Sequence, residues 1–169
     1  MITELTNVNL IKGNLQENNK KEVFEELAKM LFENNRISSK EAFLTDIEAR
    51  ETLSVTSMDG IAYPHAKSKA VTEPAIAVGV KREGIEYGDE EGVKPTVFFM
   101  IASPDNGADH HIYVLQELFG KFSEEFIEDI HNAKDENQIL NILINSQHLG
   151  TLHLNEKMDQ KNCLKSSKA

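Results

Sequence analysis

An almost unbroken apolar run between two prolines constrains the fold of this chain more than any other segment. The run is "PTVFFMIASP", from Pro95 to Pro104, and it contains no charged residue. Proline fixes its own φ and lacks an N–H donor, so it marks the limits of a strand. A strand that is apolar on both sides has to be covered on both faces. The run therefore predicts the central strand of a layered α/β sheet.

Two segments with helical spacing precede that strand. In residues 19–35 the apolar positions recur every three or four residues, which places them on one face of a helix. These positions are Val23, Phe24, Leu27, Met30 and Leu31. A shorter helix is expected from Ser38 or Ser39, either of which can be its N-cap, to Arg50 and Glu51. The apolar faces of both helices must be buried.

Short strands and two further helices are expected elsewhere. Residues 8–11 and 75–87 carry the β-branched residues typical of strands. Helical spacing returns in residues 108–122, where Asp109 can be the N-cap, and in residues 136–146. Strands flanked by helices predict an α/β fold in which the sheet is sandwiched between helices.

The length of 169 residues fits one domain, which we place at residues 1–150. Residues 151–169 are polar and end in Lys and Ser, so we expect a flexible tail. The single cysteine, Cys163, allows neither a disulfide nor a thiolate metal cluster, and its free thiol favours a reducing compartment. We therefore expect the protein in the cytoplasm.

The acidic balance of the chain limits its partners. A formal net charge of -10 argues against binding nucleic acid, and it suits a partner that carries Lys or Arg around its docking site. The N-terminus lacks a signal-peptide pattern, and no run of about 18 apolar residues occurs. Neither export nor insertion into a membrane is expected.

His65 is the first candidate for chemistry. It follows a proline in "MDGIAYPHAKS", residues 58–68, and we interpret "GIAY" as a buried strand with His65 in the turn after it. In such a turn a backbone group can hold one ring nitrogen, and the other nitrogen is then a nucleophile at neutral pH. Many single histidines are only surface or satisfied core residues, so the setting of His65 carries this hypothesis.

Two adjacent histidines begin the helix that follows the central strand. The loop before them leaves the carboxyl end of that strand, where open α/β sheets place their ligands. The first turn of a helix also has unpaired N–H groups that attract anions. His111 directly precedes the apolar helical positions and is a candidate for binding a phosphate, whereas His110 is expected at a solvated helix start.

Arg50 is expected at the end of the second helix, shortly before the segment that leads to His65. The helix dipole alone can explain a cation there. The planar guanidinium also matches the oxygens of a phosphate. His65, His111 and Arg50 together are suited to phosphoryl transfer, in which a protein positions groups and stabilises charge.

Several other chemistries lack their motifs. The chain contains no G-x-x-x-x-G-K-[ST], no G-x-G-x-x-G, no H-E-x-x-H, no paired cysteines and no G-x-S-x-G. A nucleotide, a dinucleotide, zinc and a serine nucleophile are thus not indicated. We expect neither a cofactor nor a metal ion.

Three segments resemble a known family. They are the opening helix, "ARETLSVTSMDGIAYPHAKS" and "VFFMIASPDNGADHHIYVLQEL". Together they resemble the enzyme IIA domain of the fructose/mannitol type, from the phosphoenolpyruvate-dependent sugar phosphotransferase system. The arginine-glutamate pair, the G-I-A-x-P-H segment and the histidine-led helix occur in the family's order, and the resemblance covers about residues 5–147. It implies a mixed β-sheet between helices.

The resemblance also implies roles and partners. His65 would accept a phosphoryl group from phospho-HPr and pass it to a histidine or cysteine of an enzyme IIB domain, which phosphorylates sugar during transport through a membrane IIC component. His111 would orient the phosphoryl group, and Arg50 would stabilise its charge. HPr has a basic docking region, which agrees with the acidic balance of this chain.

Two features depart from the family pattern. The family often has a glycine-rich stretch before G-I-A-I-P-H, whereas this chain keeps only Gly60 there, so contacts of Thr56, Ser57 and Asp59 cannot be carried over. Tyr63 stands where the family commonly has a small aliphatic residue, and its hydroxyl needs a partner if it is buried.

Two alternatives to the transport relay stay open from the sequence. One is a regulatory module of the nitrogen-related or transcriptional-regulator kind, with the same phosphorylated site but without sugar transport. The other is a binding domain without phosphotransfer, which would require His65 to be buried or functionally replaced. An adjacent IIB or IIC domain would distinguish the first alternative from the relay.

Overall fold

A six-stranded mixed sheet forms the centre of the protein, which a computed structural model describes over residues 2–145. The strand order is β1-β5-β6-β3-β2, and β4 also pairs with β6. The strands are β1 (Ile11–Lys12), β2 (Ser57–Met58), β3 (Ile61–Ala62), β4 (His65–Ser68), β5 (Ala75–Val80) and β6 (Val97–Pro104). The expected tail at residues 151–169 lies outside the described part of the chain.

The long strand β6 is central, as the apolar run predicts. It pairs antiparallel with β5, from Ala75 opposite Ala102 to Val80 opposite Val97, and parallel with β3 and β4. Every residue of β6 except Pro104 is buried. Residues on the two faces of the sheet belong to two separate apolar cores, which confirms that helices cover both faces.

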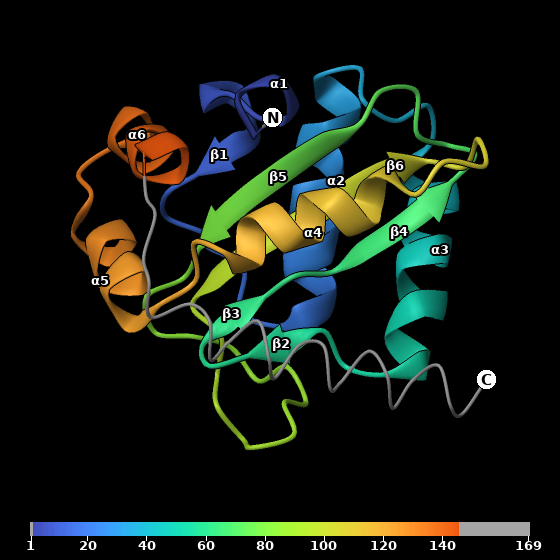
Figure 1. Cartoon of the computed structure of the whole chain (residues 1–169). Coiled ribbons are helices and arrows are strands. Elements are labelled where there is room, and N and C mark those ends of the chain that lie inside the picture. The colour runs from blue at the N-terminus through green and yellow to red at the C-terminus, as the bar shows by residue number, and fades with distance from the viewer. Residues whose placement is uncertain (1, 146–169) are drawn as a thin grey trace.

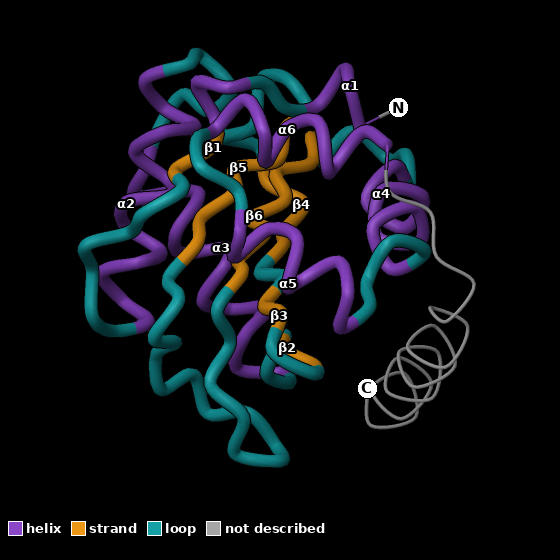
Figure 2. Tube along the Cα trace, turned by 90° about the vertical axis from the view of Figure 1, so that its left-hand side faces the viewer, coloured by secondary structure: helices purple, strands orange, loops and turns teal. Residues whose placement is uncertain are grey.

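The helices form two layers (Figures 1 and 2). Helices α2 (Lys20–Glu33) and α3 (Lys40–Leu53) cover one face of the sheet. The other core contains residues of α1 (Ile2–Leu5), α4 (His110–Phe119), α5 (Glu124–Asn132) and α6 (Glu136–Asn145). Across residues 2–145, no helix combines the length and the apolar character that crossing a membrane requires.

Side-chain caps define the starts of α2 and α3. The Asn19 side chain accepts a hydrogen bond from the Glu22 N–H at 2.9 Å, and the Ser39 hydroxyl accepts one from the Ala42 N–H at 3.1 Å. Of the two serines considered as caps, Ser39 is therefore the one used. The predicted apolar face of α2 is fully buried, which confirms that helix.

The predicted strand at residues 8–11 is mostly wrong, and one helix is missing from the prediction. Of the expected strand at residues 8–11 only the last residue is in β1, because the Asn7 side chain accepts from the Asn9 N–H at 2.8 Å and starts a 3₁₀ helix, η1 (Val8–Leu10). The strand expected within residues 75–87 is present as β5, which ends at Val80 before a turn in which the Gly84 N–H donates to the Lys81 carbonyl oxygen at 2.8 Å. Helix α5 was not predicted at all, although Ser123 caps it by accepting from the Phe126 N–H at 3.0 Å.

A tight hairpin directs the chain into the site. Its two turn residues, Asp59 and Gly60, both have positive φ, 52° and 92°. That combination is the type I′ turn, which joins β2 to β3 with the twist that paired strands need. The hairpin starts the segment from Ile61 to Ser68, which lies along β6 as β3 and β4 with a break at Tyr63 and Pro64.

Candidate functional site

A pocket with a volume of about 370 Å³ lies between α3, β4 and the start of α4. In Figure 1, α3 and the start of α4 lie beside β4, on the right of the view. The residues that line the pocket are Asp46, Ala49, Arg50, Leu53, His65, Ala66, Lys67 and His111. The fold therefore brings together all three residues that the sequence singles out, from segments up to 61 positions apart in the chain.

His65 lies in a strand and not in a turn, which corrects the interpretation from the sequence. It is the first residue of β4, opposite Ile101 of β6, and although only 8% of it is exposed it lines the pocket, so its burial does not remove it from the site. Its Nδ1 is 2.8 Å from the Tyr63 carbonyl oxygen. Because a carbonyl can only accept, Nδ1 donates, and the lone pair of the neutral ring is then on Nε2.

The ring of Tyr63 supports that of His65. The two rings are stacked, with centroids 6.0 Å apart and planes 15° apart, and Tyr63 meets Phe119 of α4 edge to face at 5.2 Å. Tyr63 is 1% exposed, and burial raises the pKa of its hydroxyl above the ordinary value, so it stays protonated at neutral pH. The large residue at this position thus fixes the plane of the His65 ring.

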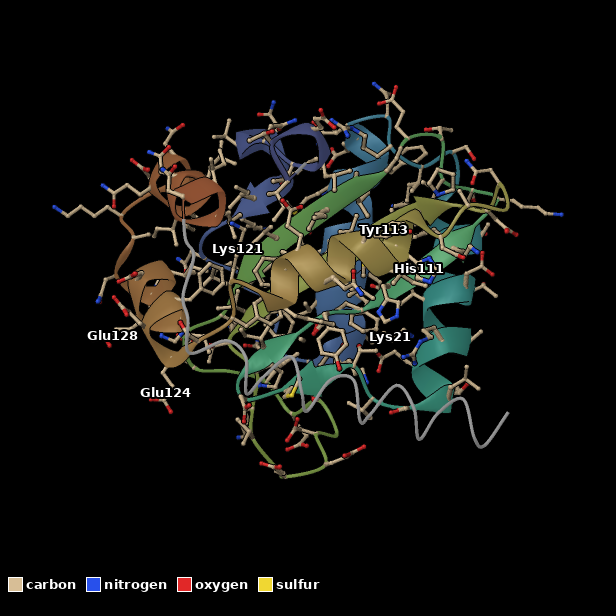
Figure 3. All side chains as sticks on the ribbon, viewed as in Figure 1. Lys21, His111, Tyr113, Lys121, Glu124 and Glu128 are labelled. Atoms are coloured by element: carbon tan, nitrogen blue, oxygen red, sulfur yellow. The ribbon has the colours of Figure 1, made fainter. Side chains whose placement is uncertain are left out.

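His111 lies in the first turn of α4 and faces the pocket (Figure 3). Burial lowers the pKa of His111, the positive charges of Lys67 and Arg50 lower it further, and Asp109 opposes them. Its Nδ1 is buried and has no hydrogen-bond partner in residues 2–145. A neutral imidazole in a pocket with two cations is prepared to gain a proton when negative charge arrives.

Arg50 reaches the pocket from the last turn of α3. In the described part of the chain its one hydrogen bond runs from Nη1 to the Ser54 carbonyl oxygen, at 3.2 Å. Burial lowers the pKa of Arg50, although the neighbouring Glu51 opposes that shift, and the group remains a cation at neutral pH. Most of its five N–H donors are thus available for an anion in the pocket.

Lys67 is a pocket residue that the sequence analysis missed. Its Nζ is 3.4 Å from the Asp109 Oδ1. Asp109 occupies the N-cap position of α4 as predicted, but its side chain makes no cap hydrogen bond there. Alternation along a strand places residues i and i+2 on one face, so Lys67 could have been found if the segment after Pro64 had been recognised as β4.

Glu51, the neighbour of Arg50, belongs to a buried network behind the pocket. Its Oε2 accepts from Lys20 Nζ at 2.9 Å, and its Oε1 accepts from the hydroxyls of Thr56 and Tyr87, the latter at 3.2 Å. A separate hydrogen bond runs nearby in the chain, from the Ser57 hydroxyl to Asp89 Oδ1 at 2.5 Å. The contacts of Glu51 fix the end of α3 and hence the position of Arg50. The sequence alone does not predict them.

In residues 2–145 no three His, Cys, Asp or Glu side chains are grouped so that they could hold a metal ion. The ionisable groups that line the pocket are two imidazoles, the two cations Arg50 and Lys67, and the carboxylate of Asp46. Such a set can bind a small anion and can offer it a nucleophilic ring nitrogen.

Comparison with known proteins connects this geometry to one family. The family described as "Phosphoenolpyruvate-dependent sugar phosphotransferase system, EIIA 2" matches residues 4–146. The fructose-specific EIIABC component of Bacillus subtilis is 32% identical over 149 residues, which cover 87% of this chain and 23% of that protein. The chain thus spans about a quarter of the length of this relative.

Shorter relatives match along most of their length. The fructose-specific EIIA component of Haloferax volcanii is 26% identical over 144 residues, or 84% of this chain and 94% of the relative. Among solved structures, the nitrogen regulatory protein IIA-Ntr from Neisseria meningitidis superposes with a TM-score of 0.77 at 26% identity, covering 84% of this chain and 98% of that one.

Proposed function

Because this chain belongs to the EIIA 2 family of the phosphoenolpyruvate-dependent sugar phosphotransferase system, we propose that His65 is its phosphoryl carrier. The observation that carries this proposal is the hydrogen bond from His65 Nδ1 to the Tyr63 carbonyl. It fixes the tautomer and the ring orientation that a nucleophilic Nε2 requires.

The proposed first step is attack by the Nε2 lone pair of His65 on the phosphorus of phospho-HPr. A new N–P bond forms on Nε2 while the donor's N–P bond breaks, and the electron pair of that bond returns to the donor's imidazole. The proton on Nδ1 remains hydrogen-bonded to Tyr63, so the phosphorylated ring can share its positive charge with that carbonyl. No nucleotide takes part in the step.

The surrounding groups stabilise the transferred charge in this proposal. The Arg50 guanidinium can contact two phosphoryl oxygens at once. His111 contributes once the arriving negative charge raises its lowered pKa and it takes up a proton. Because these groups are in place before the phosphoryl group arrives, little reorganisation is needed during transfer.

In the second step the phosphoryl group is transferred from His65 to a new acceptor. A histidine or cysteine of an enzyme IIB domain attacks the phosphorus, and His65 leaves as the neutral imidazole, so that sugar transport through a IIC component can follow. We assign this carrier function to residues 1–150 and place the relay in the cytoplasm, which the single cysteine favours.

A phosphorylation assay tests the proposal. The chain is incubated with phosphoenolpyruvate, enzyme I and HPr, and its intact mass is measured before and after mild acid, because phosphohistidine is acid-labile. Wild type should gain one acid-labile phosphoryl group and lose it when a IIB domain is added. His65→Gln should gain none, whereas His131→Gln, a matched change outside the pocket, should behave as wild type.

Two results would contradict the proposal. Phosphorylation of His65→Gln at the wild-type rate would place the carrier elsewhere. A stable phosphoryl group that no IIB domain removes would overturn the relay and favour the regulatory alternative.

A further inference from the structure

Lys67 and His65 share one face of the sheet. Side chains alternate along a strand, and Ala62 and Ala66 of this segment pack in the core under α2 and α3, whereas Ile61 and Tyr63 pack in the core under α4. His65 continues the second set, as its stacking on Tyr63 shows. Lys67, two residues further along β4, then lies on the same side as His65.

The ammonium group of Lys67 already lies on the α4 side of the pocket. Its partner Asp109 directly precedes α4, two positions before His111. The charges of Lys67 and Arg50 both act on the His111 ring. The His111 imidazole is therefore close enough to two cations, one on α3 and one on β4, for both charges to lower its pKa.

The ion pair between Lys67 and Asp109 is easily exchanged. At 3.4 Å it is long for a charge-assisted bond, and the side chains are 31% and 64% exposed. Exposed pairs of this kind contribute little to stability. A phosphoryl group carries more negative charge than a carboxylate and offers three strong acceptor oxygens, so it competes favourably for the same ammonium group.

On the basis of the proposed function, we propose that Lys67 is a phosphoryl-binding residue that leaves Asp109 for a phosphoryl oxygen when His65 is phosphorylated. In the unphosphorylated state Asp109 holds Lys67 at the pocket. After the exchange the Asp109 carboxylate is released at the N-cap position of α4, where it can accept from the N–H groups that it does not cap now. The phosphorylation state is thereby transmitted to the start of α4.

The test is the equilibrium of phosphoryl exchange between HPr and this chain, measured by intact mass. Lys67→Gln should shift it about ten-fold toward phospho-HPr, because a charge-assisted contact to the phosphoryl group is lost. Lys67→Arg should stay within about three-fold of wild type, because it keeps the cation. Lys69→Gln removes an exposed lysine two positions further along and should change the equilibrium less than about two-fold.

Asp109→Asn gives a change of opposite sign. Without the competing carboxylate, the equilibrium should move a few-fold toward phosphorylated protein. If the effect acts through Lys67, the same change should do nothing in the Lys67→Gln background, as a double-mutant cycle will show.

Each contrary result has a definite meaning. If wild type gains no phosphoryl group, the proposed function itself fails. Two other results, with wild type phosphorylated, would show that Lys67 does not bind the phosphoryl group as a cation. In one, Lys67→Gln shifts the exchange equilibrium no more than Lys69→Gln does. In the other, Lys67→Arg shifts the equilibrium as far as Lys67→Gln does. If Asp109→Asn keeps its full effect without Lys67, the exchange of partners is wrong.

Discussion

Arg50 and Glu51 are adjacent in the sequence, but they belong to opposite kinds of polar site. The Glu51 side chain is 8% exposed, and the ammonium of Lys20 and the hydroxyls of Thr56 and Tyr87 satisfy its two oxygens. Arg50 opens into the pocket with one hydrogen bond among residues 2–145, to the Ser54 carbonyl. The hydrogen-bonding capacity of the Glu51 carboxylate is thus satisfied within the protein, whereas that of the Arg50 guanidinium is not.

This difference separates structural from functional polar groups. Arg50 and Lys67 are only half-buried and have few partners, and charged groups of this kind gathered in a cleft are characteristic of functional sites. The network of Glu51 orders the loops around α3, whereas Arg50 and Lys67 have only a backbone carbonyl and an exposed carboxylate as partners, so both can still contact an anion in the pocket. Substitution at the two neighbouring positions should therefore give opposite patterns of effect.

The largest effect on stability is expected from Glu51→Gln. The change leaves the ammonium of Lys20 without its carboxylate, so the free energy of unfolding should fall by about 2–3 kcal/mol. This loss is somewhat smaller than for a fully buried ion pair, because Lys20 is partly exposed. Urea denaturation measures this loss. Glu48→Gln, at an exposed position of the same helix, should change it by less than about 0.5 kcal/mol. Equal effects of the two changes would contradict the assignment of Glu51 to structure.

A smaller effect, on transfer and not on stability, is expected from Arg50→Lys. An ammonium cannot contact two phosphoryl oxygens in a planar fork, so phosphorylation by phospho-HPr should slow about ten-fold, which corresponds to about 1.4 kcal/mol. The free energy of unfolding should stay within about 0.5 kcal/mol of wild type. If the transfer rate is unchanged and the stability is reduced, Arg50 has a structural role like that of Glu51 and does not bind the phosphoryl group.

The smallest effect concerns the titration of His111. Its pKa is lowered in the folded protein, so the unfolded state binds this proton more tightly. The contribution of neutral His111 to stability is therefore full above its ordinary pKa of 6.5 and is lost as the pH falls toward the lowered value.

Lys67→Gln removes one of the cations that lower this pKa, so NMR titration should show the pKa of His111 rising. His131 is an internal control, because burial and Arg82 lower its pKa instead. If both histidines shift together, or if neither does, Lys67 does not act on His111 through the pocket.

Local physical chemistry made much of the molecule predictable. Apolar periodicity identified α2, periodicity with a serine cap identified α3, and the run between Pro95 and Pro104 identified β6, because these signals involve only neighbours in the chain. The sequence also identified the three candidate residues His65, His111 and Arg50, since each is of a type suited to phosphate. Two local signals were overlooked: Asp59-Gly60 is a common hairpin turn, and Ser123 is the N-cap of α5.

The sequence alone thus determined helices α2, α3, α4 and α6, the central strand and the kind of chemistry, and the tertiary structure decided how the site is assembled. His65 is in a strand because β6 offers a free edge for pairing from Ile101 to Pro104. The same pairing places Lys67 in the pocket, and packing of the loop brings Tyr87 to Glu51 across 36 residues. Such contacts depend on which edges and faces meet after the chain closes on itself, and no local pattern of residues specifies that.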